Sequence, residues 1–366
     1  MAMSTKLSHV LLVIVGNVVV FLLLFVFLEL AYRIHVDGFS RAFINIWDRS
    51  GVPYSNLGTS NLVIYDAELG YRLNPQAATI NSRSVKHAEI VVPKPKDLYR
   101  IIVLGDSIPW DDGGGSFVNF LRDQIGGHGR YEVINAGVPG YTSYQELIFF
   151  KRYLLDTTPD LVIWSYCLND NHKFLHQFNE KGRMLITAEA QETLRVRTPG
   201  DFIVSRSYLL SSLQIKLMAL KEQRRTSGSP FVWERRSDVN VAWKDDTWPA
   251  YENYLTEMIR LLAPRNTKLV VVIFPFEPQL KFRHDAANYD YAIKPQRHLS
   301  ALCRSHGVDC LDLYTVFGTS YDRGVSLFQD GIHLNDQGFQ LAAATIQQFL
   351  LDKRILPVRN LSTAMR

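Results

Sequence analysis

Residues 99–107 read YRIIVLGDS, a short aliphatic run that ends in glycine, aspartate and serine. A continuous apolar run of this length, closed by glycine, predicts a strand buried on both faces of a sheet. Such strands belong to parallel sheets covered by helices, where ligands bind beyond the carboxyl ends of the strands. The polar end of the run therefore marks Ser107 as a candidate site residue.

The chain beyond this run continues as an alternation of apolar and amphipathic segments. This alternation indicates an α/β fold with a parallel sheet covered on both faces. Ser143 is the expected N-cap of one helix, because a serine hydroxyl can accept a free N–H of the first turn. Besides the first strand, at 99–104, the expected strands are 132–134, 161–166, 268–274 and 310–314; the expected helices are 117–125, 143–155, 250–262, 295–305 and 337–351.

Polar residues stand at the ends of these strands, in an order that places them at one edge of the sheet. A serine that attacks, a histidine that takes its proton and an aspartate that orients the histidine are the parts of a serine hydrolase. Alone, each motif is weak, since a single Gly-Asp-Ser or Asn-Asp is an ordinary turn or cap. The set consists of Asp106 and Ser107, the segment 135–140 (NAGVPG), Asn169 and Asp170, and the pair Asp330 and His333.

Taken together, these blocks resemble the SGNH (GDSL-type) hydrolase superfamily over roughly residues 98–352, insertion excluded. With the N-terminal apolar segment, the chain looks like the membrane-anchored bacterial members. The resemblance implies an α/β fold, a flavodoxin-like three-layer α/β/α sandwich with a five-stranded parallel sheet. No G-x-S-x-G sequence occurs, so the serine is not expected on the nucleophile elbow of an α/β-hydrolase.

The resemblance also implies a role for each block. Ser107 corresponds to the nucleophile, while His333 and Asp330 correspond to the base and its orienting carboxylate. The N–H groups of Ser107 and Gly137 and the side-chain amide of Asn169 are expected to form the oxyanion hole. A glycine at 137 is expected because a side chain there would block the approach of the substrate to the backbone. Asp106 and Asp170 are expected to support the site by hydrogen bonding.

One position departs from the family pattern. Cys167 stands where the G-x-N-D block usually begins with glycine, which adds bulk beside Asn169 and bears on acyl size. With a serine and a histidine available, Cys167 is not expected to be the nucleophile. Four further polar residues near the strand ends are expected to be solvated or at the surface: Asp111, Asp112, His172 and His176. For the two histidines, a place in the lining of the pocket is the alternative.

Composition excludes several classes of protein. A net charge of +4 over 366 residues is too small to predict nucleic-acid binding. Neither a phosphate-binding glycine loop nor a zinc spacing occurs, so no metal or organic cofactor is expected. Cys303 and Cys310 are interpreted as buried free thiols, with a disulfide in an oxidising compartment as the alternative.

The N-terminus carries a membrane signal. Residues 10–28 are almost entirely aliphatic or phenylalanine, long enough for a helix to cross a bilayer core of about 30 Å. The run continues into Glu29 rather than into small residues, which favours an uncleaved anchor over a signal peptide. By the positive-inside rule, the arginines after the apolar run outweigh the lysine before it, which slightly favours a cytoplasmic catalytic domain; these are Arg33, Arg41 and Arg49 against Lys6. A short tail before a single anchor favours the outer, periplasmic or extracellular side, which is the expectation adopted.

The expected organisation has a tail and anchor at 1–33, a juxtamembrane connector at 34–97, a hydrolase domain at 98–355 and a tail at 356–366. An insertion at about 171–245 contains a helix over 205–225, with leucines on one side and basic residues around them. That helix either packs on the domain or lies on a membrane surface. Three tryptophans in or beside the insertion are expected in the core, with sugar stacking as the alternative: Trp233, Trp243 and Trp248.

The expected function is a membrane-anchored serine esterase that removes a small acyl group, acetyl by preference, from a glycan or lipid-linked substrate. The glycan rests on analogy with tethered members of the superfamily. Two alternatives remain open. An O-acyltransferase would pass the acyl group to an envelope or exopolysaccharide hydroxyl, and a non-catalytic envelope scaffold would keep only the fold.

Overall fold

The computed structural model describes residues 2–37, 39, 62–111, 113–125, 130–178, 184–185, 200, 207–225, 228–236 and 238–357. The chain forms two compact units. One comprises residues 1–58 and 179–227, and the other comprises residues 59–178 and 228–366. Asp112, which was expected to be solvated, and the part of the expected tail from residue 358 onward lie outside the described residues.

A five-stranded parallel sheet organises the second unit. Its strand order is β4-β3-β5-β8-β9, so the chain fills the positions in the flavodoxin-like order 2-1-3-4-5. From β3 the chain goes first to β4 on one side and then crosses to β5 on the other side of β3. The point between β3 and β5 where the order reverses is the switch point at which such sheets bind ligands. The expected parallel sheet is confirmed, with the bounds β3 (Tyr99–Gly105), β4 (Tyr131–Gly137), β5 (Leu161–Tyr166), β8 (Lys268–Ile273) and β9 (Asp309–Asp312).

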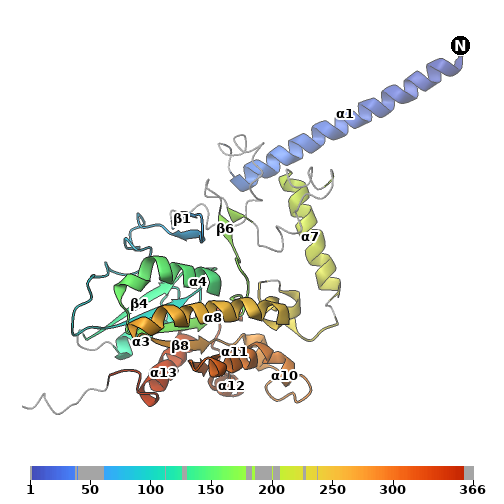
Figure 1. Ribbon diagram of the computed structural model, residues 1–366. Coiled ribbons are helices and arrows are strands. Elements are labelled where there is room, and N and C mark those ends of the chain that lie inside the picture. The colour runs from blue at the N-terminus through green and yellow to red at the C-terminus, as the bar shows by residue number, and fades with distance from the viewer. Residues whose placement is uncertain are drawn as a thin grey trace, which may run out of the picture. The chain divides into compact units, whose positions relative to one another are not determined.

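Helices cover both faces of this sheet (Figure 1). On β5, Ile163 belongs to the core formed with α3 (Phe117–Ile125), α12 (Tyr314–Asp322) and α13 (Asp336–Asp352). The next residue, Trp164, points to the other face, where it stacks on Tyr251 of α8 (Trp248–Leu262) beside α4 (Ser143–Phe149). All six residues of β5 are buried, which explains why its sequence is continuously apolar rather than alternating.

Shorter elements complete the second unit. A two-stranded antiparallel sheet precedes β3 in the chain. Among the helices, Trp248 of α8 stacks on His298 of α11. The bounds are β1 (Val63–Asp66), β2 (Gly70–Leu73), β6 (Gln177–Phe178), α9 (Glu277–Leu280), α10 (Tyr289–Ala292), α11 (Lys294–Ser305), a π-helical turn (Phe150–Leu154) and 3₁₀ turns at Leu155–Thr157, Val232–Arg235, Asn240–Trp243, Asp245–Thr247 and Ala263–Arg265.

Three local expectations were wrong. Ser143 is the first residue of α4 rather than its cap, because Thr142 has the extended backbone of an N-cap. The helix expected over 143–155 changes to a π-helical turn after Phe149. The strand expected over 310–314 lies at Asp309–Asp312, and α12, which begins at Tyr314, was not expected.

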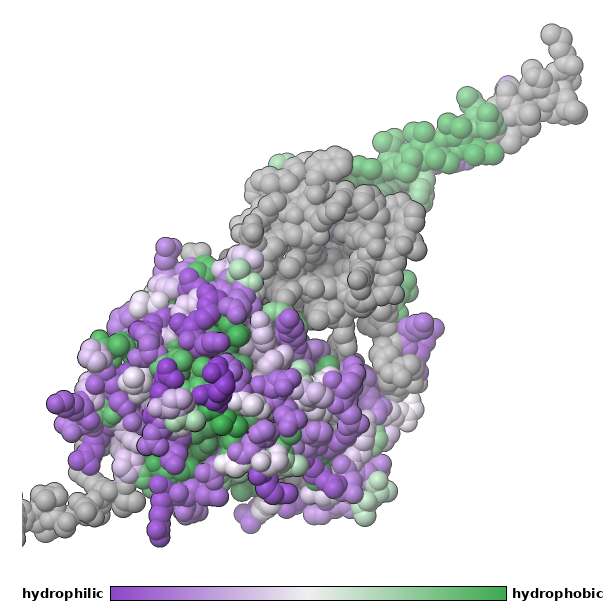
Figure 2. All heavy atoms as spheres, viewed as in Figure 1, coloured by the Kyte–Doolittle hydropathy of each residue, from purple (hydrophilic) through white to green (hydrophobic). Residues whose placement is uncertain are grey.

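The first unit contains α1 (Ala2–Asp37), β7 (Met184–Leu185) and α7 (Tyr208–Arg225). Within α1, residues Leu11–His35 are long and apolar enough to cross a membrane, and most of their surface is hydrophobic (Figure 2). The end of this segment holds the beginning of α7. The Glu29 carboxylate accepts the N–H groups of Tyr208 at 2.8 Å and Leu209 at 3.0 Å. In α7 itself, Leu213, Leu217 and Leu220 are each about half exposed.

Candidate active site

Ser107 lies just beyond the carboxyl end of β3, at the switch point of the sheet. The buried carboxylate of Asp106 accepts the N–H of Ile108 at 2.8 Å and so holds the turn that presents the serine. Gly105 is needed before this turn. A Cβ there would lie 2.6 Å from the ring of Pro109 and 3.0 Å from Ser165 on β5. The sharp end of the strand thus depends on a residue without a side chain.

Asp330 and His333 share one short loop before α13. One oxygen of the Asp330 carboxylate accepts the N–H groups of Ile332 at 3.0 Å and of His333 at 2.9 Å. The other oxygen lies 2.6 Å from Nδ1 of His333. Burial raises the pKa of Asp330, but the imidazole and the two N–H groups outweigh it and hold that pKa below its ordinary value. Asp330 therefore stays ionised and fixes the orientation of the ring.

The same imidazole reaches Ser107. Its Nε2 lies 2.9 Å from the Ser107 Oγ, although the two residues are 226 positions apart in the chain. Because an ionised Asp330 accepts a hydrogen at Nδ1, we assign the tautomer that leaves Nε2 free to accept the serine proton. The structure thus brings together the three residues that the sequence predicted as a triad, in the order required for proton transfer.

The N–H of Gly137, the expected oxyanion donor on β4, is already engaged. It donates to the side-chain oxygen of Asn135 at 3.0 Å. Gly140 lies in the following turn, which is closed by a hydrogen bond from the N–H of Tyr141 to the carbonyl of Val138 at 3.0 Å. Among the described residues, the N–H of Gly140 has no acceptor. Its φ of +75° and a Cβ position 2.5 Å from the His176 ring require glycine there.

Asn169 lies in the loop after β5, next to that turn. Its amide nitrogen is 3.4 Å from the carbonyl oxygen of Tyr141, a long contact, and the same side chain is a hydrogen-bond partner of the Asp106 carboxylate. Its buried side-chain oxygen has no partner among the described residues. Asp170 shapes the loop by accepting the N–H of Cys167 at 2.8 Å. Burial and the nearby carboxylates of Asp106 and Asp170 raise the pKa of the Cys167 thiol, so it stays protonated.

A buried group of carboxyls lies behind this loop, and it includes one residue that sequence reasoning missed. The indole N–H of Trp164 donates to one oxygen of Glu146, on α4. Burial, then the charge of Asp106, raises the pKa of Glu146 well above its ordinary value. Burial and the charges of Glu146 and Asp106 raise the pKa of Asp170 in the same way. Glu146 and Asp170 are therefore both driven toward the protonated form, so the buried group holds fewer negative charges than it has carboxyls.

This assignment also explains several buried atoms that otherwise lack a partner. In the described part of the chain, one oxygen of Glu146 and one oxygen of Asp170 have no close partner, and the Ser143 hydroxyl is the side-chain group that counteracts the rise in the pKa of Asp170. A proton on Glu146 would let these neighbouring oxygens share hydrogens rather than repel one another. A glutamate in the middle of an amphipathic helix carries no sequence signal of burial, which is why this residue could not be found from the pattern.

The remaining polar candidates are not where the sequence suggested. His172 is buried, and His176 is largely buried beside Gly140, so neither is a surface residue. Burial lowers the pKa of His176. Asp111 is only partly exposed, because it accepts the N–H groups of Gly113 at 2.8 Å and Gly115 at 3.0 Å.

The aromatic and sulfur-containing candidates have structural positions. Trp233 and Trp243 stack with ring centroids 4.7 Å apart, and Trp248 is equally buried, so core packing is confirmed and sugar stacking was wrong. Cys303 and Cys310 are free thiols; Cys303 is buried, and Cys310 is partly exposed. Among the described residues, no group of three or more His, Cys, Asp or Glu side chains is arranged to hold a metal ion.

Arg236 is a further residue that the sequence did not single out. It pairs with Asp238, and its guanidinium lies 5.5 Å from the centre of the Phe276 ring. The hydrogen bond to Asp238 raises the pKa of Arg236, and the negative charge of Asp330 contributes. A permanent positive charge is therefore close enough to the triad loop to stabilise the ionised aspartate.

One family model and several solved structures match the chain. The model of the GDSL-like lipase/acylhydrolase family matches residues 103–341, more than half of the chain. No curated protein matches the chain.

Several solved structures are similar to the chain. A lipase/acylhydrolase from Enterococcus faecalis is 16% identical and has a TM-score of 0.40, over 72% of this chain and 100% of its own. An acetylxylan esterase mutant from Geobacillus stearothermophilus is 14% identical, with a TM-score of 0.41, over 69% of this chain and 94% of its own. These identities and TM-scores are too low to bear on the substrate of this chain.

Proposed function

Because the chain belongs to the GDSL-like lipase/acylhydrolase family and is an ester-hydrolysing enzyme, we propose that Ser107, His333 and Asp330 are its catalytic triad. The observation that carries the proposal is the continuous contact from Asp330 to His333 at 2.6 Å and from His333 to Ser107 at 2.9 Å. In the reaction, Nε2 of His333 takes the Ser107 proton as Oγ attacks the ester carbonyl. Asp330 stabilises the imidazolium that forms.

The tetrahedral intermediate needs donors for its oxyanion. We propose the N–H of Ser107 and the side-chain amide of Asn169 for two of them, as the sequence predicted. For the third donor, the sequence prediction names Gly137, whose N–H is committed to Asn135. The N–H of Gly140 is the better candidate, because it has no acceptor among the described residues and lies beside Tyr141, which Asn169 contacts.

We propose a small acyl group, acetyl by preference, as the group that is removed. The support is Cys167, a buried residue with a side chain at the position next to Asn169 where a glycine is usual in the family. The bulk of the thiol beside the proposed oxyanion hole would shorten the acyl site. A glycan or lipid-linked alcohol remains the proposed other half of the ester. Acyl transfer to a sugar hydroxyl would use the same residues with a different acceptor.

The decisive experiment uses the full chain in detergent micelles. A fluorophosphonate probe is expected to label Ser107 stoichiometrically, and the protein is expected to hydrolyse p-nitrophenyl acetate faster than the butyrate or octanoate. Ser107→Ala should lose both labelling and hydrolysis. A folded wild-type protein that takes no label would refute the enzyme and favour the scaffold alternative. Acetylated product formed from an added oligosaccharide acceptor, beside free acetate, would identify an acyltransferase.

We propose that α1 is a retained membrane anchor rather than a cleaved signal. Support comes from within the first unit, where the end of α1 takes part in folded structure. Glu29 accepts two N–H groups at the start of α7, and Arg33 lies 4.1 Å from the centre of the Tyr208 ring. Removing α1 would take away the Glu29 carboxylate that accepts the N–H groups of Tyr208 and Leu209. An outward-facing catalytic domain completes the proposal, and a reporter fused after residue 357 tests it by its activity on each side of the membrane.

A further inference from the structure

A polar cavity of about 310 Å³ lies at the edge of the sheet, beside β4. Because β4 is an edge strand, no other strand covers its outer side. The cavity is closed instead by the loop 86–88, the segment around Asp111 and helix α3. An adjoining hollow of about 430 Å³ shares the loop 86–88. A space of this size is within the range of small-molecule sites.

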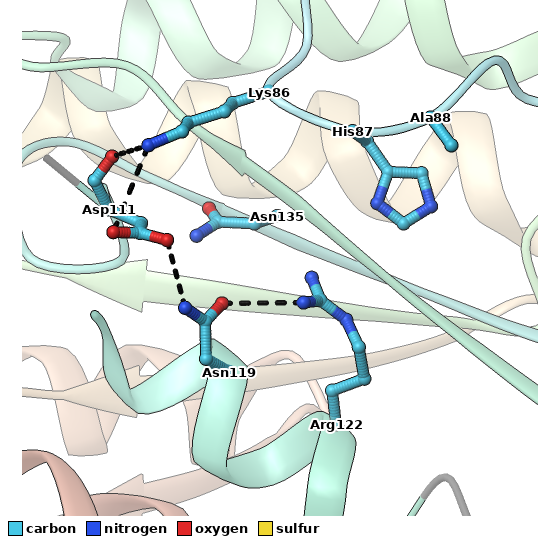
Figure 3. Close-up of a pocket in the computed structure, with 7 residues that line it drawn as sticks. All are labelled: Lys86, His87, Ala88, Asp111, Asn119, Arg122 and Asn135. Atoms are coloured by element: carbon cyan, nitrogen blue, oxygen red, sulfur yellow. Dashed lines mark hydrogen bonds and ion pairs between the residues drawn. The ribbon is translucent and has the colours of Figure 1, made fainter. Parts of the chain in front are cut away.

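The charges on one side of the cavity are balanced. Lys86 and Asp111 lie there (Figure 3), with the Lys86 Nζ 3.8 Å from a carboxylate oxygen and also bonded to the Asp111 carbonyl. The other carboxylate oxygen accepts the amide of Asn119 at 2.9 Å. Burial raises the pKa of Asp111, but these bonds and its N–H donors hold it below the ordinary value. Asp111 is therefore ionised, neutralised by Lys86 and without free oxygens.

The opposite side carries a charge that no described residue balances with an ion pair. Arg122 reaches into the cavity from α3, toward His87 (Figure 3). Its Nε donates to the carbonyl of Val133 at 3.1 Å and its Nη1 to the Asn119 side-chain oxygen at 3.4 Å, both neutral acceptors. In the described part of the chain, Arg122 forms no ion pair and its Nη2 has no acceptor. The guanidinium is thus fixed in position with one edge open.

The neighbouring groups do not supply the missing negative charge. Glu132 is paired with the buried Arg100, and its second oxygen lies 3.9 Å from Nε2 of His87. Burial, then the positive charge of Arg122, lowers the pKa of His87, and Arg100 adds to this against the opposing effect of Glu132. His87 is therefore neutral near pH 7 and can donate one N–H. Among the described residues that line the 310 Å³ cavity, the excess charge is a single positive one.

We propose that this cavity binds the carboxylate of a small organic acid, with the open edge of Arg122 as the ion-pairing group and His87 and Lys86 as additional hydrogen-bond donors. A guanidinium edge matches a carboxylate in geometry. One excess positive charge matches a monoanion better than a phosphate dianion. A structural network alone accounts for Lys86, Asp111 and Asn119, but leaves the open edge of Arg122 unexplained. The volume admits an acid of roughly monosaccharide size.

Calorimetric titration of the full chain in detergent tests this proposal, with sodium glucuronate as the probe and glucose as its uncharged counterpart. Glucuronate is expected to bind with one site per chain and glucose at least tenfold more weakly, at matched ionic strength. Ser107→Ala should bind glucuronate as the wild type does, so this test is independent of the hydrolase proposal. No saturable glucuronate binding, or equal binding of glucose, would overturn the proposal. Tighter binding of inorganic phosphate would overturn the assignment of a carboxylate.

Variants locate the site. Arg122→Gln is expected to weaken glucuronate binding at least tenfold, about 1.4 kcal/mol. The matched control is Arg260→Gln, which removes an exposed arginine that pairs with Glu257 on α8. This control should bind as the wild type does. If Arg122→Gln does not fold, Arg122→Lys keeps the charge but loses the planar edge and should bind more weakly than the wild type. Unchanged binding in the folded Arg122 variant would refute the site.

Discussion

The N–H of Gly137 donates to the side-chain oxygen of Asn135, two residues earlier on the same strand, at 3.0 Å. The amide nitrogen of Asn135 in turn donates to the carbonyl of Pro109, in the loop that follows Ser107. One buried side chain therefore ties the end of β4 to the nucleophile loop. This link gives Asn135 a structural role and removes Gly137 from the free donors at the site.

Asn135→Ala is expected to destabilise the protein. The change leaves the Gly137 N–H and the Pro109 carbonyl without these partners, at about 1–3 kcal/mol for each group that stays buried and unsatisfied. Urea unfolding measures the loss, and Asn288→Ala is the control at a partly exposed asparagine. Unchanged stability would contradict the role of Asn135. A rise in turnover would instead show that a freed Gly137 N–H serves as an oxyanion donor.

Asp330→Asn is expected to lower kcat by about 10⁴ on p-nitrophenyl acetate. The amide cannot hold the imidazole in the tautomer that accepts the Ser107 proton, nor can it stabilise the imidazolium. The pKa of Asp330 is held low, so the wild type keeps this carboxylate ionised down to acidic pH. Asp336→Asn, at an exposed position in the first turn of α13, is the control. A loss of less than tenfold in Asp330→Asn would remove the aspartate from the triad.

Asn169→Ala is expected to lower kcat by about 10²–10³ with little change in KM. An oxyanion donor acts mainly in the transition state, so its loss appears in turnover rather than in substrate binding. Steady-state kinetics with a soluble acetyl ester separate the two parameters. A rise in KM at constant kcat would place Asn169 in substrate binding instead of the oxyanion hole.

Glu146→Gln is expected to make the protein less sensitive to rising pH. The pKa of Glu146 is raised in the folded protein, so the folded chain keeps this proton while the unfolded chain releases it above the ordinary value of 4.5. Folding therefore becomes less favourable as pH rises above that value, by about 1.4 kcal/mol per pH unit until the folded-state pKa is reached.

Glutamine cannot titrate and keeps an acceptor for Trp164. The fall in Tm between about pH 5 and pH 8 should therefore be smaller in Glu146→Gln than in the wild type. Differential scanning calorimetry at the two pH values measures this fall. An equal or larger fall in the variant would mean that Glu146 is ionised in the folded protein.

Glu29→Ala is expected to loosen the start of α7. The change removes the acceptor of the Tyr208 and Leu209 N–H groups and of the Ser207 hydroxyl, and loss of such a cap costs about 0.5–2 kcal/mol. Hydrogen exchange of the peptide covering residues 207–212 should accelerate by about tenfold. Peptides of β8 serve as the internal control. Unchanged exchange at 207–212 would show that the carboxylate does not hold the helix in solution.

Sequence patterns predicted the sheet well because its strands are buried on both faces. The run Leu161–Tyr166 was predicted to the residue, since an uninterrupted apolar segment between turns has few alternatives. The last strand was misplaced and α12 was missed, because the residues of β9 are only partly buried and the chain enters the helix two residues later. The apolar residues of α3 recur with a strong helical periodicity, so its sequence predicted the helix. The apolar stripe of α12 is weak, so periodicity did not reveal that helix.

The contact between the three residues of the proposed triad was predictable because serine, histidine and aspartate carry their chemistry in their identity and stand at strand ends. The surroundings of the triad were not. Glu146 is an unremarkable residue on a helix until Trp164 and Asp170 are seen beside it. The use of the Gly137 N–H by Asn135 depends on a side-chain rotamer, which no sequence pattern encodes. Buried polar partners are set by three-dimensional packing and must be read from the structure.

His333 is held in place by the start of α13, where Asn335 accepts the N–H of Gly338 at 3.0 Å and donates its own N–H to the carbonyl of Leu327 at 3.0 Å. Ser107 leaves the ribosome 226 residues before this histidine. A growing chain therefore carries the proposed nucleophile without its proposed base throughout most of synthesis. With this triad, ester cleavage requires α13 to have packed beside α3, so the protein is expected to be catalytically silent until its fold is closed.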